Sequence, residues 1–338
     1  MRKLILLFII LLLALSACSL PVLTAQQQTP QAVAQLIVTA DPNAAPTATP
    51  FMPVDPTTTS IVDPTATPEV TPGANTAAST VEQPSNTVSI LVMGSDARGD
   101  GSFRTDSMIL VIINQDTGAV AMVSFPRDLY VEVPGYGQQR INTAQEYGGF
   151  PLTVQTFQNN FGVTPDYYVM TDFQGFVNII NNLGGIQVDA SQNLTDTCKL
   201  AQAVNGYCSV GPGQVYMDGA TALWYVRSRY SSNDFDRTRR QQEVITAIFK
   251  KLMSLDAITK LPSLYQEYTQ SVATNVPLDE AVKLATFAPG LVSDPDKIHR
   301  FAIGSADVWS YITPGGAQVL LPNPDRIQPI LDEAFSVQ

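Results

Sequence analysis

Three apolar segments near the middle of the chain place the strongest constraint on how it can fold. Residues 88–93, 107–114 and 119–125 are rich in Val, Ile and Met and have the composition of strands. Only Gln115-Asp116-Thr117-Gly118 separates the last two segments, and a short polar link ending in glycine is typical of a hairpin. Because the segments are almost continuously hydrophobic, we predict strands at the centre of a sheet, covered on both faces.

The rest of the chain alternates between segments with helical and with strand periodicity. Helices are predicted at residues 152–161, 173–183, 220–229, 237–255, 261–270, 278–287 and 323–335, and further strands at 167–171, 186–189, 300–303 and 317–321. Strands interleaved with helices indicate an α/β fold, specifically an α-β-α layered sandwich with a central mixed β-sheet covered by helices.

The N-terminus predicts export from the cytoplasm. Arg2 and Lys3 precede a run of Leu and Ile, and Leu15-Ser16-Ala17-Cys18 resembles a bacterial lipobox. A membrane-spanning helix needs about 20 apolar residues, which favours a cleaved lipoprotein signal peptide at residues 1–18 with lipidation at Cys18. The alternative is an uncleaved signal anchor. Both tether the protein to the outer face of the cytoplasmic membrane.

Residues 19–86 predict a disordered linker. This segment is rich in Pro, Thr, Ala and Gln and contains no Lys or Arg, so it has too little apolar surface to form a packed core. It suits a spacer that holds a domain away from the membrane, although a linker without any length requirement would have the same composition. Residues 87–338 are long enough for one large domain with a full core.

The scarcity of Cys and His excludes several reaction classes. Besides Cys18 the chain has only Cys198 and Cys208, which we expect to pair as a loop disulfide in an oxidising location. His299 is the only histidine and no G-x-S-x-G segment occurs, which argues against serine and cysteine hydrolases. A nucleotide P-loop is also excluded, because Asp100 follows Gly99 where that motif requires Lys.

The distribution of charge predicts an anionic ligand. The formal net charge of −11 argues against nucleic-acid binding. Between residues 87 and 245, however, the chain has a single lysine, Lys199, and nine arginines: Arg98, Arg104, Arg127, Arg140, Arg227, Arg229, Arg237, Arg239 and Arg240. The planar guanidinium group suits bidentate binding of phosphate or carboxylate.

Residues 94–107 mix both signs of charge between two apolar segments. Asp96 and Asp106 lie in this stretch without soft ligands nearby. Two carboxylates of this kind suit a hard divalent ion, Mg²⁺ or Mn²⁺ in its place, that keeps several waters and takes its other ligands from substrate phosphates. The sequence therefore predicts a combined metal and arginine site.

Several ordered motifs carry a resemblance to a known family. They are 94–98 (GSDAR), 104–106 (RTD), 124–130 (SFPRDLY), 140–142 (RIN), 225–229 (YVRSR) and 233–242 (NDFDRTRRQQ). In this order the set closely resembles the LytR-CpsA-Psr family of bacterial enzymes, which work outside the membrane and attach glycopolymers to peptidoglycan. The resemblance covers about residues 88–255, and more loosely the remaining C-terminal part.

The resemblance implies roles for individual residues. Asp96 and Asp106 match metal-associated aspartates, and Gln241 matches a polar residue beside them. The arginines that match pyrophosphate-facing positions are Arg98, Arg104, Arg127, Arg227, Arg229 and Arg237. Asp234 is a candidate general base, although nothing in the sequence separates a base from a metal ligand. Asn233 and Asp236 depart from the family pattern, and Arg127 could instead pair structurally with Asp128.

The implied reaction is phosphoryl transfer by an extracytoplasmic enzyme. A polyprenyl-pyrophosphate-linked glycan would bind with its lipid chain between sheet and helices, and a peptidoglycan hydroxyl would attack the phosphorus on the glycan side. The products are a glycan joined to peptidoglycan through a phosphodiester and polyprenyl phosphate. Two alternatives remain open: a pyrophosphatase that uses water as acceptor, and a non-catalytic lipoprotein that binds wall polymers.

Overall fold

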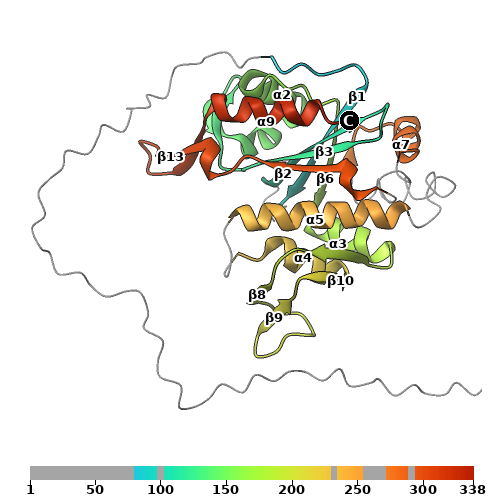
Figure 1. Cartoon of the computed structure of the whole chain (residues 1–338). Helices are drawn as coiled ribbons and strands as arrows, with labels where there is room; N and C mark the ends of the chain where they lie inside the picture. Colours follow the sequence, from blue (N-terminus) through green and yellow to red (C-terminus); the bar gives the residue numbers. More distant parts are fainter. Residues whose placement is uncertain (1–79, 97–102, 230–233, 254–271, 288–293) are drawn as a thin grey trace, which may run out of the picture. The chain divides into compact units, whose positions relative to one another are not determined.

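The structure is a computed structural model that describes residues 80–96, 103–229, 234–253, 272–287 and 294–338 (Figure 1). The predicted signal peptide with Cys18, most of the predicted linker, Arg98 and the predicted helix at 261–270 lie outside these residues. In the part of the chain that is described, none of the helices combines the length and hydrophobicity needed to cross a membrane.

A six-stranded mixed sheet with the order β11-β6-β1-β2-β3-β12 forms the centre of the fold (Figure 1). Antiparallel pairing joins β1 to β2, β2 to β3 and β6 to β11, whereas β6 lies parallel to β1 and β12 parallel to β3. The strands are β1 (Thr87–Ser95), β2 (Thr105–Asn114), β3 (Val120–Phe125), β6 (Tyr167–Asp172), β11 (Ala273–Thr274) and β12 (Ile298–Ala302). The predicted hairpin between β2 and β3 and the mixed sheet are confirmed.

Both faces of the central strands are covered, as their hydrophobicity predicts. Leu110 and Ile112 face a core with helices α2 (Ala144–Phe161) and α9 (Pro324–Phe335). The alternate residues Ile109 and Val111 face side chains of α5 (Asp234–Met253) and α7 (Leu278–Ala285). Figure 1 shows α2 and α9 on one side of the sheet and α5 on the other. The predicted α-β-α sandwich is therefore correct.

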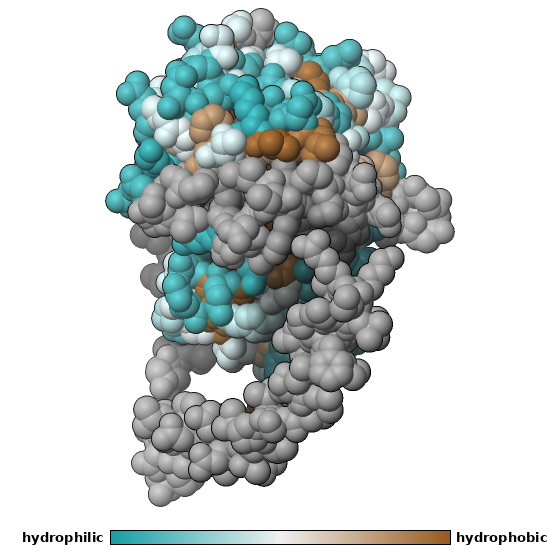
Figure 2. Space-filling view, turned by 90° about the vertical axis from the view of Figure 1, so that its right-hand side faces the viewer, coloured by the Kyte–Doolittle hydropathy of each residue, from teal (hydrophilic) through white to brown (hydrophobic). Residues whose placement is uncertain are grey.

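A second core lies beyond α5, on the side away from the sheet. It contains α3 (Phe173–Asn182), α4 (Gly219–Arg227), β7 (Ile186–Ala190) and β10 (Gly213–Met217). Val244 and Ala247 of α5 belong to this core, while Ile245 packs on the sheet. Helix α5 is thus buried on two sides. On the face shown in Figure 2 the described surface is mainly hydrophilic, because these cores hold most of the large apolar residues.

Some elements differ from the sequence prediction. Helix α2 begins at Ala144, eight residues before the predicted start, but Gly148 and Gly149 have non-helical backbone and Gly149 has φ of 63°. The predicted helix therefore corresponds to the part of α2 after this break. The predicted strand at 317–321 corresponds to β14 (Gln318–Pro322). The sequence analysis missed the other short strands, because their residues alternate weakly: β4 (Tyr130–Val133), β5 (Gly137–Arg140), β8 (Leu194–Thr197), β9 (Tyr207–Val210), β10, β11 and β13 (Val308–Ile312).

The β8–β9 hairpin carries a disulfide bond. It joins Cys198 to Cys208 with 5.7 Å between their Cα atoms. The hairpin also contacts α4, because the indole nitrogen of Trp224 donates a hydrogen bond to the carbonyl of Thr197 at 2.9 Å. The disulfide therefore stiffens a hairpin that is attached to a helix of the second core.

The close approach of α3 and α4 depends on Gly219. A Cβ atom added there would lie 2.3 Å from the carbonyl oxygen of Val177 and 2.8 Å from its Cα. Alanine ordinarily stabilises a helix relative to glycine, but here it would force α4 away from α3. We expect Gly219→Ala to lower the free energy of unfolding by about 1–3 kcal/mol, measured by thermal unfolding followed by circular dichroism.

The matched control is Gly211→Ala, where the nearest atom to the added Cβ is 3.8 Å away. Its melting temperature should stay close to that of the wild type. Equal melting temperatures for the two variants would contradict the close packing of these helices.

Candidate functional site

A cavity of about 220 Å³ lies between the sheet and helices α3, α4 and α5. Its apolar lining residues are Val92, Met93, Phe173, Phe176, Leu223, Val226, Val244 and Ile245. Its charged and amide residues are Asp106, Arg127, Asp172, Arg227, Arg229, Arg237 and Gln241. At the end of α4 the lining changes from apolar at Val226 to charged at Arg227 and, just beyond the helix, Arg229. Along α5 it changes from charged at Arg237 to apolar at Ile245. The cavity can accommodate an amphiphile with an anionic end.

A β-bulge turns Asp106 toward this cavity. Gly94 pairs with Ser107 and Ser95 with Thr105, so Asp106 is the additional residue on β2. A bulge of this kind redirects the side chain that it carries. Asp96 lies one residue past the bulged pair, where its carboxylate accepts a hydrogen bond from the backbone nitrogen of Arg104 at 2.6 Å. The two predicted metal-associated aspartates thus lie close to one irregularity of the sheet, Asp106 on β2 and Asp96 directly after β1.

Arg127 is held by carboxylates on two sides. Its guanidinium contacts Asp106 at 2.5 Å and Asp128 at 3.5 Å. Asp128 in turn contacts Arg140 at 3.2 Å. The ion pair between Arg127 and Asp128 that the sequence analysis considered is therefore present, and so is the contact between Arg127 and Asp106. Arg127 nevertheless lines the cavity.

The other arginines of the cavity come from the ends of two helices. Arg227, in the last turn of α4, lies over the ring of Phe173 with 4.1 Å between its guanidinium carbon and the ring centroid, which is a favourable cation–π distance. Arg237 is buried in the first turns of α5. In the next turn, Gln241 accepts a hydrogen bond from the hydroxyl of Ser107 at 3.1 Å. This contact links α5 to the bulged strand.

Arg240 fixes the end of α4, a role that the sequence analysis did not assign. It is 1% exposed, and its guanidinium donates hydrogen bonds to the carbonyl oxygens of Tyr225 and Ser228. Carbonyl groups at the end of a helix lack partners within the helix, and a positive charge there is favourable. Burial lowers the pKa of Arg240 from its usual value. Because Arg240 holds this turn, it sets the direction in which Arg227 and Arg229 leave α4.

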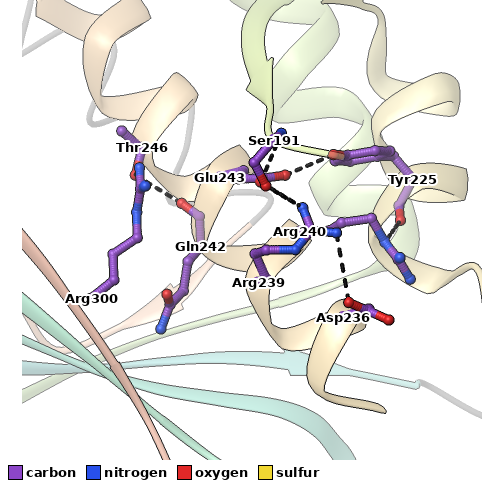
Figure 3. Close-up of polar contacts among 9 residues, drawn as sticks. All are labelled: Ser191, Tyr225, Asp236, Arg239, Arg240, Gln242, Glu243, Thr246 and Arg300. Atoms are coloured by element: carbon purple, nitrogen blue, oxygen red, sulfur yellow. Dashed lines mark hydrogen bonds and ion pairs between the residues drawn. The ribbon is translucent and has the colours of Figure 1, made fainter. Parts of the chain in front are cut away.

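A buried carboxylate supports the same arrangement (Figure 3). Glu243 accepts hydrogen bonds from the phenol of Tyr225, the hydroxyl of Ser191 and the guanidinium of Arg239, each at 2.7 Å. Burial, and then the bond to Glu243, raises the pKa of Tyr225. The mixture of acidic and basic residues in residues 236–243 is the signal in the sequence that could have pointed to this network, but it does not distinguish an internal network from a ligand site.

The structure brings most of the predicted site residues together. Asp106, Arg127, Arg227, Arg229, Arg237 and Gln241 line the cavity. Arg104 instead lines a neighbouring polar cavity. Asp234 is the first residue of α5, but its side chain lies outside the described part of the structure. Among the residues that are described, no three His, Cys, Asp or Glu side chains are grouped to hold a metal ion.

An apolar cavity with clustered guanidinium groups, set between a mixed sheet and its helices, is suited to an amphiphile whose polar end is anionic. A model of the LytR_cpsA_psr family matches residues 58–332. The chain therefore belongs to the LytR_cpsA_psr family.

Named relatives and solved structures are consistent with this assignment. The chain is 34% identical, over 57% of its length, to the polyisoprenyl-teichoic acid–peptidoglycan teichoic acid transferase TagU of Bacillus licheniformis, and this match covers 61% of that relative. A crystal structure of B. subtilis TagV is similar with a TM-score of 0.62 and 28% identity, covering 75% of this chain and 99% of the other. A structure of TagT bound to LIIa-WTA has a TM-score of 0.56 and 28% identity, covering 74% and 90%.

The buried position of Arg240 can be tested by substitution. Arg240→Met keeps most of the side-chain volume but leaves the carbonyl oxygens of Tyr225 and Ser228 without their donors. We expect a loss of about 2–4 kcal/mol in the free energy of unfolding, measured by urea denaturation. The exposed Arg326 of α9 provides the control, and Arg326→Met should unfold at nearly the wild-type urea concentration. Equal midpoints for both variants would contradict the capping role.

Proposed function

We propose that this protein transfers a glycopolymer from a polyprenyl-pyrophosphate carrier to a hydroxyl group of peptidoglycan, forming a phosphodiester outside the cytoplasmic membrane. The observation that carries the proposal is the cavity whose apolar walls lead to Asp106 and four arginines. The TagU relative is named as a teichoic acid transferase acting between a polyisoprenyl carrier and peptidoglycan. The match spans less than two thirds of that relative, so its activity is proposed here for this chain.

The lining of the cavity suits both parts of such a donor. The apolar residues contributed by β1, α3, α4 and α5 suit the first isoprenoid units, whose transfer out of water is favourable. The guanidinium groups of Arg127, Arg227 and Arg237 suit the pyrophosphate, because planar donors bind phosphate oxygens in pairs. The stacking of Arg227 on Phe173 would keep that cation oriented before the donor arrives.

Phosphoryl transfer depends mainly on stabilising the negative charge that develops on phosphate oxygens. The acceptor hydroxyl oxygen forms a bond to the glycan-side phosphorus, and the bond from this phosphorus to the oxygen of polyprenyl phosphate breaks. The hydroxyl proton leaves the acceptor, and negative charge accumulates on the departing phosphate. Arginines aimed at these oxygens lower the barrier. Asp234 at the start of α5 remains our candidate for accepting the proton, because Asp106 is already bound to Arg127.

The aspartates beside the bulge fit a hard divalent cation. Asp106 lines the cavity, and Asp96 directly follows the end of the paired strand β1, so both candidate ligands are carboxylate oxygens. Two carboxylates leave coordination positions for water and substrate phosphates, which is the usual arrangement for Mg²⁺. When bound there, Mg²⁺ or Mn²⁺ would neutralise phosphate oxygens that the arginines do not reach. Lipidation at Cys18, which would hold the enzyme at the membrane, stays a prediction.

Removing one arginine of the cavity should slow transfer strongly. We expect Arg127→Ala and Arg227→Ala each to reduce kcat/KM by about a hundredfold or more, because each removes a cation that faces the departing phosphate. The assay follows a labelled glycan from a polyprenyl-pyrophosphate donor into insoluble peptidoglycan. Arg326→Ala, outside the cavity, should retain wild-type activity. Normal transfer and normal donor affinity in both cavity variants would refute the site.

The products separate the proposed function from its alternatives. Transfer yields glycan bound to peptidoglycan, a pyrophosphatase yields free phosphoglycan even when acceptor is present, and a binding protein yields no turnover. The first outcome supports the proposal, and either of the other two overturns it.

Chelation tests the metal independently of the arginines. We expect EDTA to abolish transfer and Mg²⁺ in excess to restore it, because the phosphate charge is otherwise only partly neutralised. Asp106→Asn should raise the Mg²⁺ concentration needed for half-maximal activity by about tenfold or more, a value that corresponds to about 1.4 kcal/mol of binding energy. The carboxylate of Asp332 on the surface of α9 offers the control Asp332→Asn. Full activity in EDTA would exclude a required metal.

A further inference from the structure

A second cavity, of about 290 Å³, is lined by a different part of the fold. Its residues come from hairpin β4–β5, the start of α2, hairpin β13–β14 and Arg104. An ion-pair chain connects it to the first cavity, because Asp128 contacts both Arg127 of the first and Arg140 of the second. We call it the hairpin cavity.

Two exposed tyrosines stack at this place. The rings of Tyr136 and Tyr147 have centroids 4.7 Å apart and an interplanar angle of 27°, and Tyr147 lines the hairpin cavity. They are 51% and 39% exposed. A rigid aromatic surface with a polar edge is suited to packing against the C–H face of a pyranose ring while the phenol group meets its hydroxyls.

The polar groups of the hairpin cavity match an acidic, amide-bearing sugar. The side-chain oxygen of Asn142 is buried and has no hydrogen-bond partner among the residues that the structure describes, although Asn142 lines the cavity. A buried acceptor without a partner is costly, and a hydroxyl or amide N–H of a ligand would satisfy it. Gln138 and Gln139 supply further amides, and Arg104 and Arg140 supply positive charge.

Of these two arginines, Arg104 is the one that can attract an anion. Arg140 is already engaged, through Asp128 at 3.2 Å and through the carbonyl of Gln318 at 2.8 Å. Arg104 is exposed, and its side chain has no ion pair with any residue in the described ranges. A carboxylate on the bound sugar would supply that partner.

The way the cavities share lining residues indicates which cavity suits the donor glycan and which suits the acceptor glycan. A third cavity, beside the disulfide hairpin, shares Leu223, Arg227 and Arg229 with the first cavity. The donor glycan is covalently attached to the bound pyrophosphate, so it needs a space that is continuous with the first cavity, as the third cavity is. The hairpin cavity shares no lining residue with the first one, which suits a separate molecule.

Resting on the proposed function, we infer that the hairpin cavity is the acceptor subsite and binds a sugar of the peptidoglycan strand that carries a carboxylate or an N-acyl group. In this arrangement Tyr136 and Tyr147 bind the sugar face, Arg104 binds its anionic substituent, and Asn142 accepts a hydrogen bond from it. The acceptor thereby approaches the pyrophosphate past Asp128, whose ion pairs join Arg127 to Arg140.

The test measures binding and transfer separately, using the full chain in detergent. The probe is a soluble tetrasaccharide of alternating N-acetylglucosamine and N-acetylmuramic acid, titrated calorimetrically. We expect Tyr147→Ala and Tyr136→Ala each to weaken its binding, and to raise the acceptor KM in the transfer assay, by about tenfold. The affinity for the polyprenyl-pyrophosphate donor should stay unchanged. Tyr147→Phe should restore acceptor binding, because it keeps the stacked ring.

Tyr216→Ala serves as the matched control. Tyr216 is 58% exposed and lies on β10, outside the hairpin cavity, so the acceptor Kd and KM should not change. Unchanged Kd and KM in both hairpin-cavity variants would overturn the inference, even if the wild type is an active transferase. Displacement of the tetrasaccharide by the donor's own glycan would also overturn it, because the cavity would then belong to the donor.

The two proposals fail in different ways. A wild type that binds the tetrasaccharide through Tyr147 but never transfers to peptidoglycan would sustain the sugar subsite and refute the transferase. A wild type that transfers normally, with a KM insensitive to both tyrosines, would sustain the transferase and refute the subsite.

Discussion

The mutual repulsion of several guanidinium groups in one cavity is the constraint on which the rest of the site depends. Arg127, Arg227 and Arg237 line the same space, and like charges at short range destabilise one another. Each is held by a separate local device. Asp106 binds Arg127, the ring of Phe173 lies under Arg227, and Arg237 is buried near the start of α5. The site can therefore exist before a phosphate arrives to neutralise it, which is the preorganisation that electrostatic catalysis requires.

Helix α5 is the element that makes this possible. It lies between the sheet and the second core, so its side chains contact different parts of the fold. Ile245 packs on the sheet, Val244 packs in the second core, and Gln241 is hydrogen-bonded to Ser107 of β2. Two of the charged groups buried along it have partners within the protein: Glu243 receives hydrogen bonds from several donors, and Arg240 binds carbonyl oxygens at the end of α4. A buried charge is tolerated only when it is paired in this way. The same bonds fix the end of α4, and with it Arg227 and Arg229.

The hairpins contribute to a second cavity next to the first one. The β4–β5 and β13–β14 hairpins are small and lie outside the central sheet, yet they carry Tyr136 of the exposed tyrosine pair and part of the lining of the hairpin cavity, while α2 carries Tyr147. Asp128 bridges Arg127 and Arg140 between the two cavities. In the proposed reaction the sandwich positions the groups that would bind phosphate, whereas the hairpins supply part of the surface on which a second substrate would be selected, a division that is common when function resides in loops on a stable scaffold.

The central strands, most helices and the layered α/β class could be predicted from the amino-acid sequence, because apolar periodicity and composition reflect burial directly. The residues that resemble the family motifs could also be recognised there. It could not place β4, β5, β8 or β9, whose polar residues alternate too weakly. The different positions of the arginines could not be predicted before the fold was known: Arg237 lines the cavity, Arg240 caps α4, and Arg104 lines a different cavity. These arginines have the same charge and similar motif positions, and what each one meets depends on packing between segments far apart in the chain.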